Sequence, residues 1–268
     1  MILMKLFKTT VATALSLVMA FGLVGCSKPA AEPTGDQAEE PAGEKKTYVI
    51  ATDTTFAPFE FENEAGEFVG IDMDILKAIA EDQGFEVDLQ VLGFNAAVQA
   101  LEAGQADGVI AGMSITDERK LKFDFSDPYF DSGVVMGIAK DNEEIKTYED
   151  LAGKKVAVKT GTEGYAFAES IADEYGFELV TFDDSNAMYQ DVLIGNSVAC
   201  FEDYPVMGYA ISQNVGLKIV TDMEAGNSYG FAVGKGKNAE LLQMFNDGLK
   251  NITESGKYQE ILDTYIQK

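Results

Sequence analysis

The chain has no histidine and no tryptophan, and it has only two cysteines, Cys26 and Cys200. The lack of histidine excludes catalysis by an imidazole base and zinc sites with histidine ligands. Two cysteines are too few for a cysteine-rich metal cluster or a disulfide framework. Basic residues are also scarce, because 20 of them stand against 45 acidic residues and give a formal net charge of −25 over 268 residues. This charge excludes a nucleic-acid partner, since binding to phosphates needs a basic surface.

Arginine occurs once, as Arg119, against nineteen lysines. Lysine therefore supplies the ordinary positive surface charge, and the single arginine needs an explanation of its own. A guanidinium group binds a carboxylate through two parallel hydrogen bonds, which makes Arg119 a candidate for holding an acidic ligand group. The alternative is a surface ion pair with the preceding Asp117 or Glu118, which would contribute little to stability.

The N-terminal segment has the pattern of an export signal. Lys5 and Lys8 precede an uncharged apolar run over residues 9–24, which is too short and too rich in small residues for a typical membrane span. The run ends in the tetrad LVGC, which resembles a bacterial lipobox, whose cysteine is acylated. We therefore expect a signal peptide over residues 1–25 and a lasting lipid anchor on Cys26. An ordinary signal peptide followed by a chance cysteine is the alternative.

The segment after this cysteine is poor in apolar residues. Residues 27–46 are rich in Pro, Ala, Glu and Gly, and they contain no large apolar side chain that could join a core. We expect residues 26–46 to form a disordered tether and the folded part to begin near Thr47. Because lipidation of Cys26 would leave Cys200 unpaired, no intramolecular disulfide is expected outside the cytoplasm.

From Thr47 onward, strand and helix patterns alternate along the chain. Such alternation predicts β-α-β units with mostly parallel sheets. The pattern runs through two successive blocks and therefore predicts two α/β lobes. The strands are expected at residues 48–52, 87–91, 107–113, 155–159, 179–182 and 198–201, and the helices at 71–79, 96–103, 162–175, 186–194 and 239–265.

Residues that follow the predicted strands are the candidates for ligand binding, because ligands of open α/β sheets lie beyond the carboxyl ends of the strands. These positions offer one Arg, one Lys, several acids, two phenylalanines and several hydroxyls, a set that suits a small zwitterion. Each also has an ordinary structural reading, as a core ring, a helix cap, a turn residue or a solvated charge. The candidates are Asp53, Phe56, Phe94, Ser114, Arg119, Lys159, Thr162, Glu202 and Asp203.

Several stretches of the chain resemble the extracytoplasmic solute-binding proteins that feed polar amino acids to ABC importers. The resemblance covers residues 47–268, and the stretch over 156–162 is especially similar to glutamine-binding members. It implies an α/β, two-lobed periplasmic-binding-protein fold of type II, with a ligand cleft between lobes that two crossover strands join. The similar stretches are ATDTTFAPFEF (51–61), GIDMDI (70–75), AGMSITDERK (111–120), FSDPYF (125–130) and VAVKTGT (156–162).

In such a fold the first lobe is discontinuous. We expect it to contain residues 47–130 and 232–268, and the second lobe to contain residues 131–231. The resemblance also implies how a ligand's α-carbon groups are held. Its carboxylate would be bound by Arg119, Ser114 and the backbone N–H groups of Thr162 and Glu163, and its ammonium group by Asp203 and the carbonyl of Gly112.

The resemblance further implies contacts with the ligand side chain. Phe56 and Phe94 would pack on its aliphatic stem, and Asp53 and Lys159 would meet a side-chain amide. Glutamine binders of this type carry histidine at the position of Glu202. The extra acid there leaves basic amino acids open as the alternative ligand, although Lys159 would repel a second cation.

The sequence therefore predicts a membrane-tethered extracytoplasmic receptor that captures a polar L-amino acid, with glutamine as the best guess, and delivers it to ABC permease subunits. It is expected to be a monomer without metal or cofactor and not an enzyme. An exported dehydratase of the same fold is the rival class, in which a carboxyl pair such as Asp53 and Glu202 could share a proton. A sensor ectodomain is a third reading.

Overall fold

A computed structural model describes residues 45–266 of the chain. The predicted signal peptide, Cys26 and all but the last two residues of the predicted tether lie outside the described residues. Within the described part, no helix is both long and apolar enough to cross a bilayer. The same part contains no group of three or more Cys, Asp or Glu residues placed to hold a metal ion.

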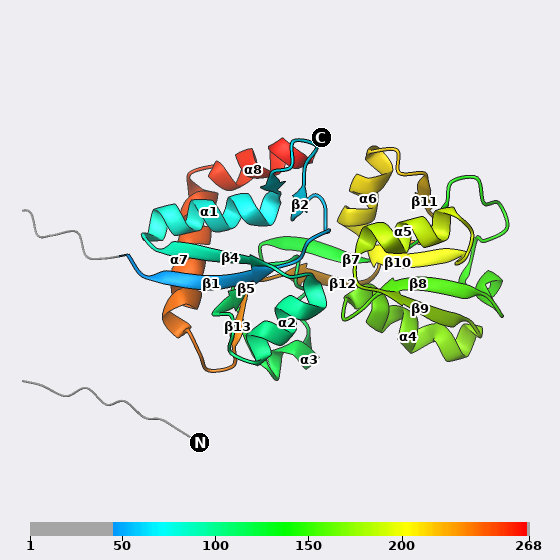
Figure 1. Cartoon of the computed structure of the whole chain (residues 1–268), viewed down its shortest axis with the longest axis horizontal. Coiled ribbons are helices and arrows are strands. Elements are labelled where there is room, and N and C mark those ends of the chain that lie inside the picture. The colour runs from blue at the N-terminus through cyan, green and yellow to red at the C-terminus, as the bar shows by residue number, and fades with distance from the viewer. Residues whose placement is uncertain (1–44, 267–268) are drawn as a thin grey trace, which may run out of the picture. The chain divides into compact units, whose positions relative to one another are not determined.

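The first lobe is built on a five-stranded sheet with the order β4-β1-β5-β13-β6 (Figure 1). Strand β1 pairs in parallel with β4 and β5, whereas β13 is antiparallel to β5 and β6. A short hairpin, β2 and β3, follows β1. The strands are β1 (Thr47–Thr52), β2 (Phe61–Glu62), β3 (Phe68–Val69), β4 (Glu86–Val91), β5 (Gly108–Val109), β6 (Phe123–Phe125) and β13 (Ala232–Gly234).

Helices cover both faces of this sheet. Tyr48 and Ile50 of β1 are buried in the cluster that holds α1, α7 and α8, while Ala51 belongs to the cluster beneath α2. This division follows from the alternation of side chains along a strand. The helices are α1 (Ile71–Gln83), α2 (Phe94–Glu102), α3 (Asp117–Lys120), α7 (Ala239–Glu254) and α8 (Lys257–Tyr265).

The second lobe has a six-stranded sheet with the order β11-β7-β10-β8-β9, and β12 pairs with β7 beside it. Strand β8 is parallel to β9 and β10. Helix α4 covers one face, and α5 and α6 cover the other. The elements are β7 (Phe130–Ala139), η1 (Tyr148–Leu151), β8 (Lys155–Lys159), α4 (Glu163–Tyr175), β9 (Glu178–Phe182), α5 (Ser185–Leu193), β10 (Ala199–Asp203), α6 (Tyr204–Ser212), β11 (Leu217–Ile219) and β12 (Glu224–Tyr229).

Two antiparallel strands join the lobes. At one end of the pair, Phe130 of β7 lies opposite Tyr229 of β12, and the backbone N–H of Ile115 in the first lobe donates to the carbonyl of Ser228. From there both strands continue into the second sheet, as Figure 1 shows. The two lobes and the α/β architecture are those expected from the sequence. The lobe boundaries given above stay a prediction.

Three predicted elements differ from the structure. The strand expected over residues 107–113 is reduced to β5, and the chain beyond it turns through Gly112, whose φ is 51°. The helix expected over 239–265 is divided into α7 and α8 at Gly256, whose φ of 83° interrupts helical geometry. Strand β10 runs on to Asp203, so Glu202 and Asp203 lie within the strand and not after it. This last difference bears directly on the site.

Candidate functional site

A small, narrow cavity lies between the two lobes. Ten of the eleven predicted ligand-binding residues line it, and Glu202 does not. Ala111 is an additional lining residue that sequence reasoning missed, although it belongs to one of the similar stretches, residues 111–120. The lining residues are Asp53, Phe56, Phe94, Ala111, Gly112, Ser114, Arg119, Lys159, Thr162, Glu163 and Asp203.

Strand ends bring these residues together. Asp53 follows β1 directly, Lys159 is the last residue of β8, and Asp203 is the last residue of β10. Phe94 begins α2 just after β4. The carboxyl ends of parallel strands meet at one edge of a sheet, and here the edges of both sheets contribute to the same cavity.

Arg119 lies at one end of the cavity, with its side chain 14% exposed. Its guanidinium donates to the carbonyl of Ser114 at 2.9 Å and, across the lobes, to the carbonyl of Gly161 at 3.0 Å. It also forms an ion pair with Glu163 at 3.4 Å and stacks over the Phe94 ring at 5.4 Å. Burial lowers the pKa of Arg119 from its usual value, although nearby acids oppose that shift. The group is a buried cation that can bind a carboxylate.

Asp203 supplies an acid to the same cavity. It is 3% exposed, and its Oδ2 accepts a hydrogen bond from the Tyr229 hydroxyl at 2.5 Å. Burial raises the pKa of Asp203 to about 7, and the charge of Glu202 adds to the rise. The carboxylate form of Asp203 can bind an ammonium group, and its equilibrium with the neutral acid lies near physiological pH.

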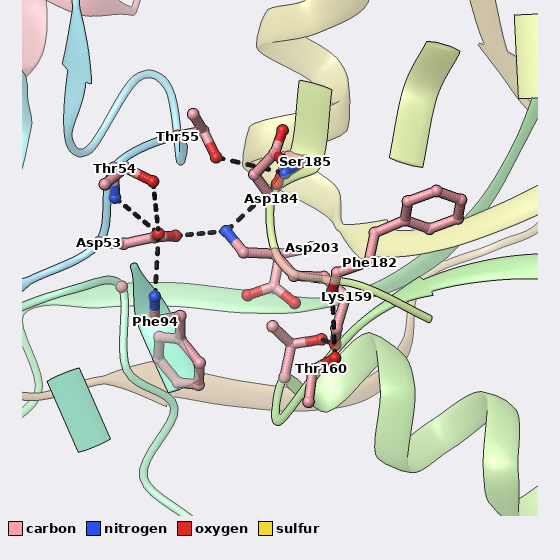
Figure 2. Close-up of polar contacts among 12 residues, drawn as sticks. Asp53, Thr54, Thr55, Phe94, Lys159, Thr160, Phe182, Asp184, Ser185 and Asp203 are labelled. Carbon is pink, nitrogen blue, oxygen red and sulfur yellow. Dashed lines mark hydrogen bonds and ion pairs between the residues drawn. The ribbon is translucent and has the colours of Figure 1, made fainter. Parts of the chain in front are cut away.

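Asp53 and Lys159, which also line the cavity, form a salt bridge with each other. We call this pair the neutral end of the cavity, and Arg119 with Asp203 the charged end. Both are about 1% exposed, and they come from different lobes. Figure 2 shows that Asp53 also accepts from the backbone N–H groups of Thr54 at 2.6 Å and Phe94 at 3.0 Å. Because the two charges cancel, this end of the cavity carries hydrogen-bonding groups with no net charge.

Glu202 lies behind this salt bridge. Side chains alternate along β10, so Asp203 faces the cavity while Glu202 faces helix α5. Its carboxylate accepts from the hydroxyls of Ser185 at 3.0 Å and Tyr189 at 3.1 Å. Lys159 in turn donates to Ser185 at 3.4 Å. Glu202 is therefore not among the lining residues of the cavity, and Ser185 and Lys159 link it to Asp53. Its expected direct contact with ligand stays a prediction.

The same arrangement bears on the rival enzyme class. A proton shared between Asp53 and Glu202 would require their carboxyl groups to touch. Asp53 is instead paired with a lysine, and Glu202 is bound by two hydroxyls. Burial raises the pKa of Glu202, whereas Lys159 lowers it. The residues that suggested a catalytic acid pair thus form a chain of hydrogen bonds that fixes Lys159.

The two phenylalanines, Phe56 and Phe94, also line the cavity. Phe56 is 4% exposed, and Lys159 Nζ lies 5.2 Å from its ring centroid. A Cβ atom on Gly112 would come within 2.3 Å of the Phe56 ring, so only glycine fits beneath it. Phe94 is 5% exposed and carries Arg119 above its face. Each ring therefore packs against one of the two cations that line the cavity.

The loop that precedes α4 closes the cavity from the second lobe. Thr162 caps this helix, because its hydroxyl accepts from the N–H of Tyr165 at 3.2 Å and donates to the carbonyl of Lys159 at 2.8 Å. The helix N-terminus favours negative charge. Its first residue is Glu163, whose carboxylate meets Arg119 at 3.4 Å.

The sequence matches the bacterial extracellular solute-binding proteins, family 3, over residues 48–268. The chain belongs to this family. It is 30% identical over 220 residues to the arginine-binding extracellular protein ArtP of Bacillus subtilis, a match that covers 81% of this chain and 85% of that protein. It is therefore a member of a family of extracellular solute-binding proteins, and the relative above is itself a binding protein.

Two solved structures extend the comparison. An ancestral arginine-binding protein bound to glutamine is 38% identical with a TM-score of 0.77, covering 84% of this chain and all of that one. Substrate binding domain 2 of GlnP from Lactococcus lactis, in an open conformation, is 42% identical with a TM-score of only 0.56, covering 84% and 97%. That domain was solved with its lobes open, whereas the lobes of this family 3 protein are in direct contact. This difference in lobe arrangement agrees with a lower TM-score at a higher sequence identity.

Proposed function

We propose that this protein is an extracytoplasmic receptor that binds a polar L-amino acid, glutamine in particular, and delivers it to ABC permease subunits. It acts as a monomer, without metal or cofactor, and acylated Cys26 holds it on the outer side of the cell membrane. The observation that carries the proposal is that Arg119 and Asp203 both line one small buried cavity. The guanidinium can bind the α-carboxylate of an amino acid, and the carboxylate can bind its α-ammonium group.

The neutral end of the cavity supports an amide side chain. Asp53 offers a carboxylate that accepts from an NH₂ group, and Lys159 offers an ammonium group that donates to a carbonyl. A cationic side chain would be repelled by Lys159, and a second carboxylate would be repelled by Asp53. One relative is named as an arginine-binding protein, and an ancestral arginine-binding protein was solved with glutamine bound. The choice between glutamine and arginine here therefore rests on the Asp53–Lys159 pair.

Titration calorimetry of the protein against single amino acids tests the proposal. Glutamine, glutamate, arginine, lysine and histidine form the informative set, because they share the α-carbon groups and differ in side-chain charge. We expect glutamine to bind tightest. Tightest binding of arginine or lysine would replace glutamine by a basic ligand, and the absence of binding to any of the twenty amino acids would overturn the receptor itself.

Lobe closure is the motion that such a receptor uses. Contacts that cross between the lobes include the Asp53–Lys159 pair and the backbone N–H of Ser185, which donates to the Thr55 hydroxyl at 3.2 Å. A ligand that touches both lobes stabilises the closed form by its differential affinity for that form. Small-angle scattering should show a smaller radius of gyration with glutamine than without it. An unchanged radius at saturating ligand would contradict a closing clamp.

A further inference from the structure

Two carboxyl groups outside the cavity are completely buried. Glu60, between β1 and β2, and Asp72, in the first turn of α1, are both 0% exposed. Three of their four carboxyl oxygens have no N–H or O–H donor among the described residues, namely both oxygens of Glu60 and Oδ1 of Asp72. An unpaired buried polar atom is costly, and an unpaired buried charge is costlier still.

The two residues lie side by side, because the backbone N–H of Asp72 donates at 2.9 Å to the carbonyl of Phe59, the residue before Glu60, and each carboxyl group influences the pKa of the other. Two ionised carboxylates in contact would repel strongly, whereas one retained proton turns the contact into a hydrogen bond. Burial raises the pKa of Glu60 well above its usual range, and the charges of Asp72 and Asp53 add to the rise. Burial also raises the pKa of Asp72 to about 6, but hydrogen bonds to its charged form limit that rise. The proton therefore belongs on Glu60.

Asp72 also accepts two other hydrogen bonds. Its Oδ2 accepts the backbone N–H of Gly112 at 2.7 Å and the hydroxyl of Tyr129 at 2.8 Å. Gly112 lines the ligand cavity, and Tyr129 immediately precedes the crossing strand β7. The Asp72 carboxylate thus links the start of α1 by hydrogen bonds to the loop that carries Gly112 and to the residue that precedes β7.

We propose that Glu60 keeps its proton at neutral pH and donates it in a hydrogen bond to ionised Asp72, and that this acid pair is a positioning device for Gly112 and Tyr129. The pair touches no ligand. It acts by fixing the loop whose glycine lies under Phe56 and by holding the residue from which β7 departs.

The charged and titratable neighbours fit this assignment. Asp53 of the first lobe disfavours ionisation of Glu60, while Lys159 of the second lobe favours it. Tyr129 and Tyr258 face Asp72, and the pKa of each is raised, first by burial and then by that charge. Both phenols therefore stay protonated near neutral pH, and Tyr129 remains a donor to Asp72.

The test compares two substitutions of Glu60. Glu60→Gln keeps the shape and replaces the O–H donor by an N–H donor, whereas Glu60→Met keeps the length and removes the donor. Glu62→Gln, an exposed change two residues away, is the matched control. We expect Glu60→Gln to retain wild-type affinity for glutamine within about threefold, and Glu60→Met to lose about tenfold, the scale of one hydrogen bond to a charged group.

Infrared spectroscopy supplies a readout that a merely structural role would not move. At pH 8 the difference spectrum between wild type and Glu60→Gln should contain the C=O stretching band of a protonated carboxyl group. The control difference with Glu62→Gln should lack it. Absence of that band from the wild-type difference would overturn the proposal, and this outcome does not depend on whether Glu60→Met folds.

The pH dependence of unfolding gives a second readout. A carboxyl group whose folded-state pKa is raised contributes stability that is complete below its unfolded pKa and is lost as pH rises through the folded one. Above about pH 5, wild type should therefore lose stability relative to Glu60→Gln, by up to about tenfold in the unfolding equilibrium constant for each pH unit. Parallel profiles for the two proteins would refute a proton on Glu60. Failure of glutamine to bind would leave both readouts intact, so this proposal and the proposed function fail separately.

Discussion

The two ends of the cavity handle charge in different ways. At one end Arg119 donates to two main-chain carbonyls and forms a 3.4 Å ion pair with Glu163 of the neighbouring lobe, while Asp203 accepts from a tyrosine hydroxyl. Arg119 and Asp203 are not paired with each other by any of these contacts, so each can meet an opposite charge on a ligand. At the other end Asp53 and Lys159 neutralise each other across the lobes. The first end suits the groups that all amino acids share. The second can select a side chain by hydrogen bonding, because it offers no net charge.

Among the substitutions considered, removal of Arg119 should reduce ligand affinity the most. Arg119→Ala would leave a ligand carboxylate buried without its cation, at a cost on the order of 2–5 kcal/mol, or roughly thirtyfold to several thousandfold in Kd. Calorimetry with glutamine measures the loss. Melting of the ligand-free protein should stay close to wild type, because the guanidinium contacts only two main-chain carbonyls and the half-buried Glu163.

Lys120→Ala is the matched control for this change. Lys120 is the next residue along α3, and its side chain is 53% exposed. It should bind glutamine as wild type does. Normal binding by Arg119→Ala, or loss of its folded state, would remove Arg119 from the site.

Substitution of Lys159 should shift the binding preference of the neutral end toward ligands with a cationic side chain. Lys159→Met keeps the chain length and leaves Asp53 as an unpaired acid. Arginine should then gain on glutamine by about tenfold or more in relative affinity, since a charge-assisted hydrogen bond to Asp53 contributes on the order of 1.5–3 kcal/mol. Competition between labelled glutamine and arginine measures the ratio.

Lys155→Met controls for the loss of a lysine from the same strand, because Lys155 is exposed at the start of β8. Melting should fall in Lys159→Met and not in the control, since removal of one partner strands a buried charge. An unchanged preference in a folded Lys159→Met protein would show that Asp53 does not face the ligand side chain.

The pH dependence of binding should report on the charged end. Asp203 has a pKa of about 7, and an ammonium group favours its ionised form. Glutamine affinity should therefore be highest above pH 7 and should fall as pH drops below it, approaching about tenfold per pH unit. Calorimetry in buffers of different ionisation enthalpy should detect release of a proton on binding near pH 6.

Two variants locate this effect. Glu60→Gln should keep the pH dependence, whereas Asp203→Asn should bind more weakly and lose most of it. A flat profile in wild type would contradict the assignment of the ammonium group to Asp203.

The smallest effect is expected at Glu202. Glu202→Gln keeps the shape of a residue that lies outside the cavity, so glutamine affinity should change by no more than about fivefold, the scale of one ordinary hydrogen bond. Any change would act through Ser185 and Lys159. A loss greater than tenfold for glutamine or arginine, measured by calorimetry, would place Glu202 in contact with ligand after all.

Much of this site could be predicted because most of its residues follow closely after apolar runs that read as strands. Apolar runs such as the one before Asp53 end abruptly in polar residues, and parallel strand ends must converge. Glu202 could not be placed in this way. One further residue of β10 decides which of two neighbouring acids faces the cavity, and strand ends are poorly marked in sequence.

By itself the sequence determined the chemistry available to this protein: one arginine, no histidine, acids after strands, and the two-lobed family fold. Only the tertiary structure decided how that chemistry is divided. Asp53 and Lys159 are 106 residues apart in the chain and on different lobes, so nothing local could reveal that they neutralise each other. The same holds for Glu60 and Asp72, whose shared proton depends on complete burial, which is a property of the packed core and not of either segment.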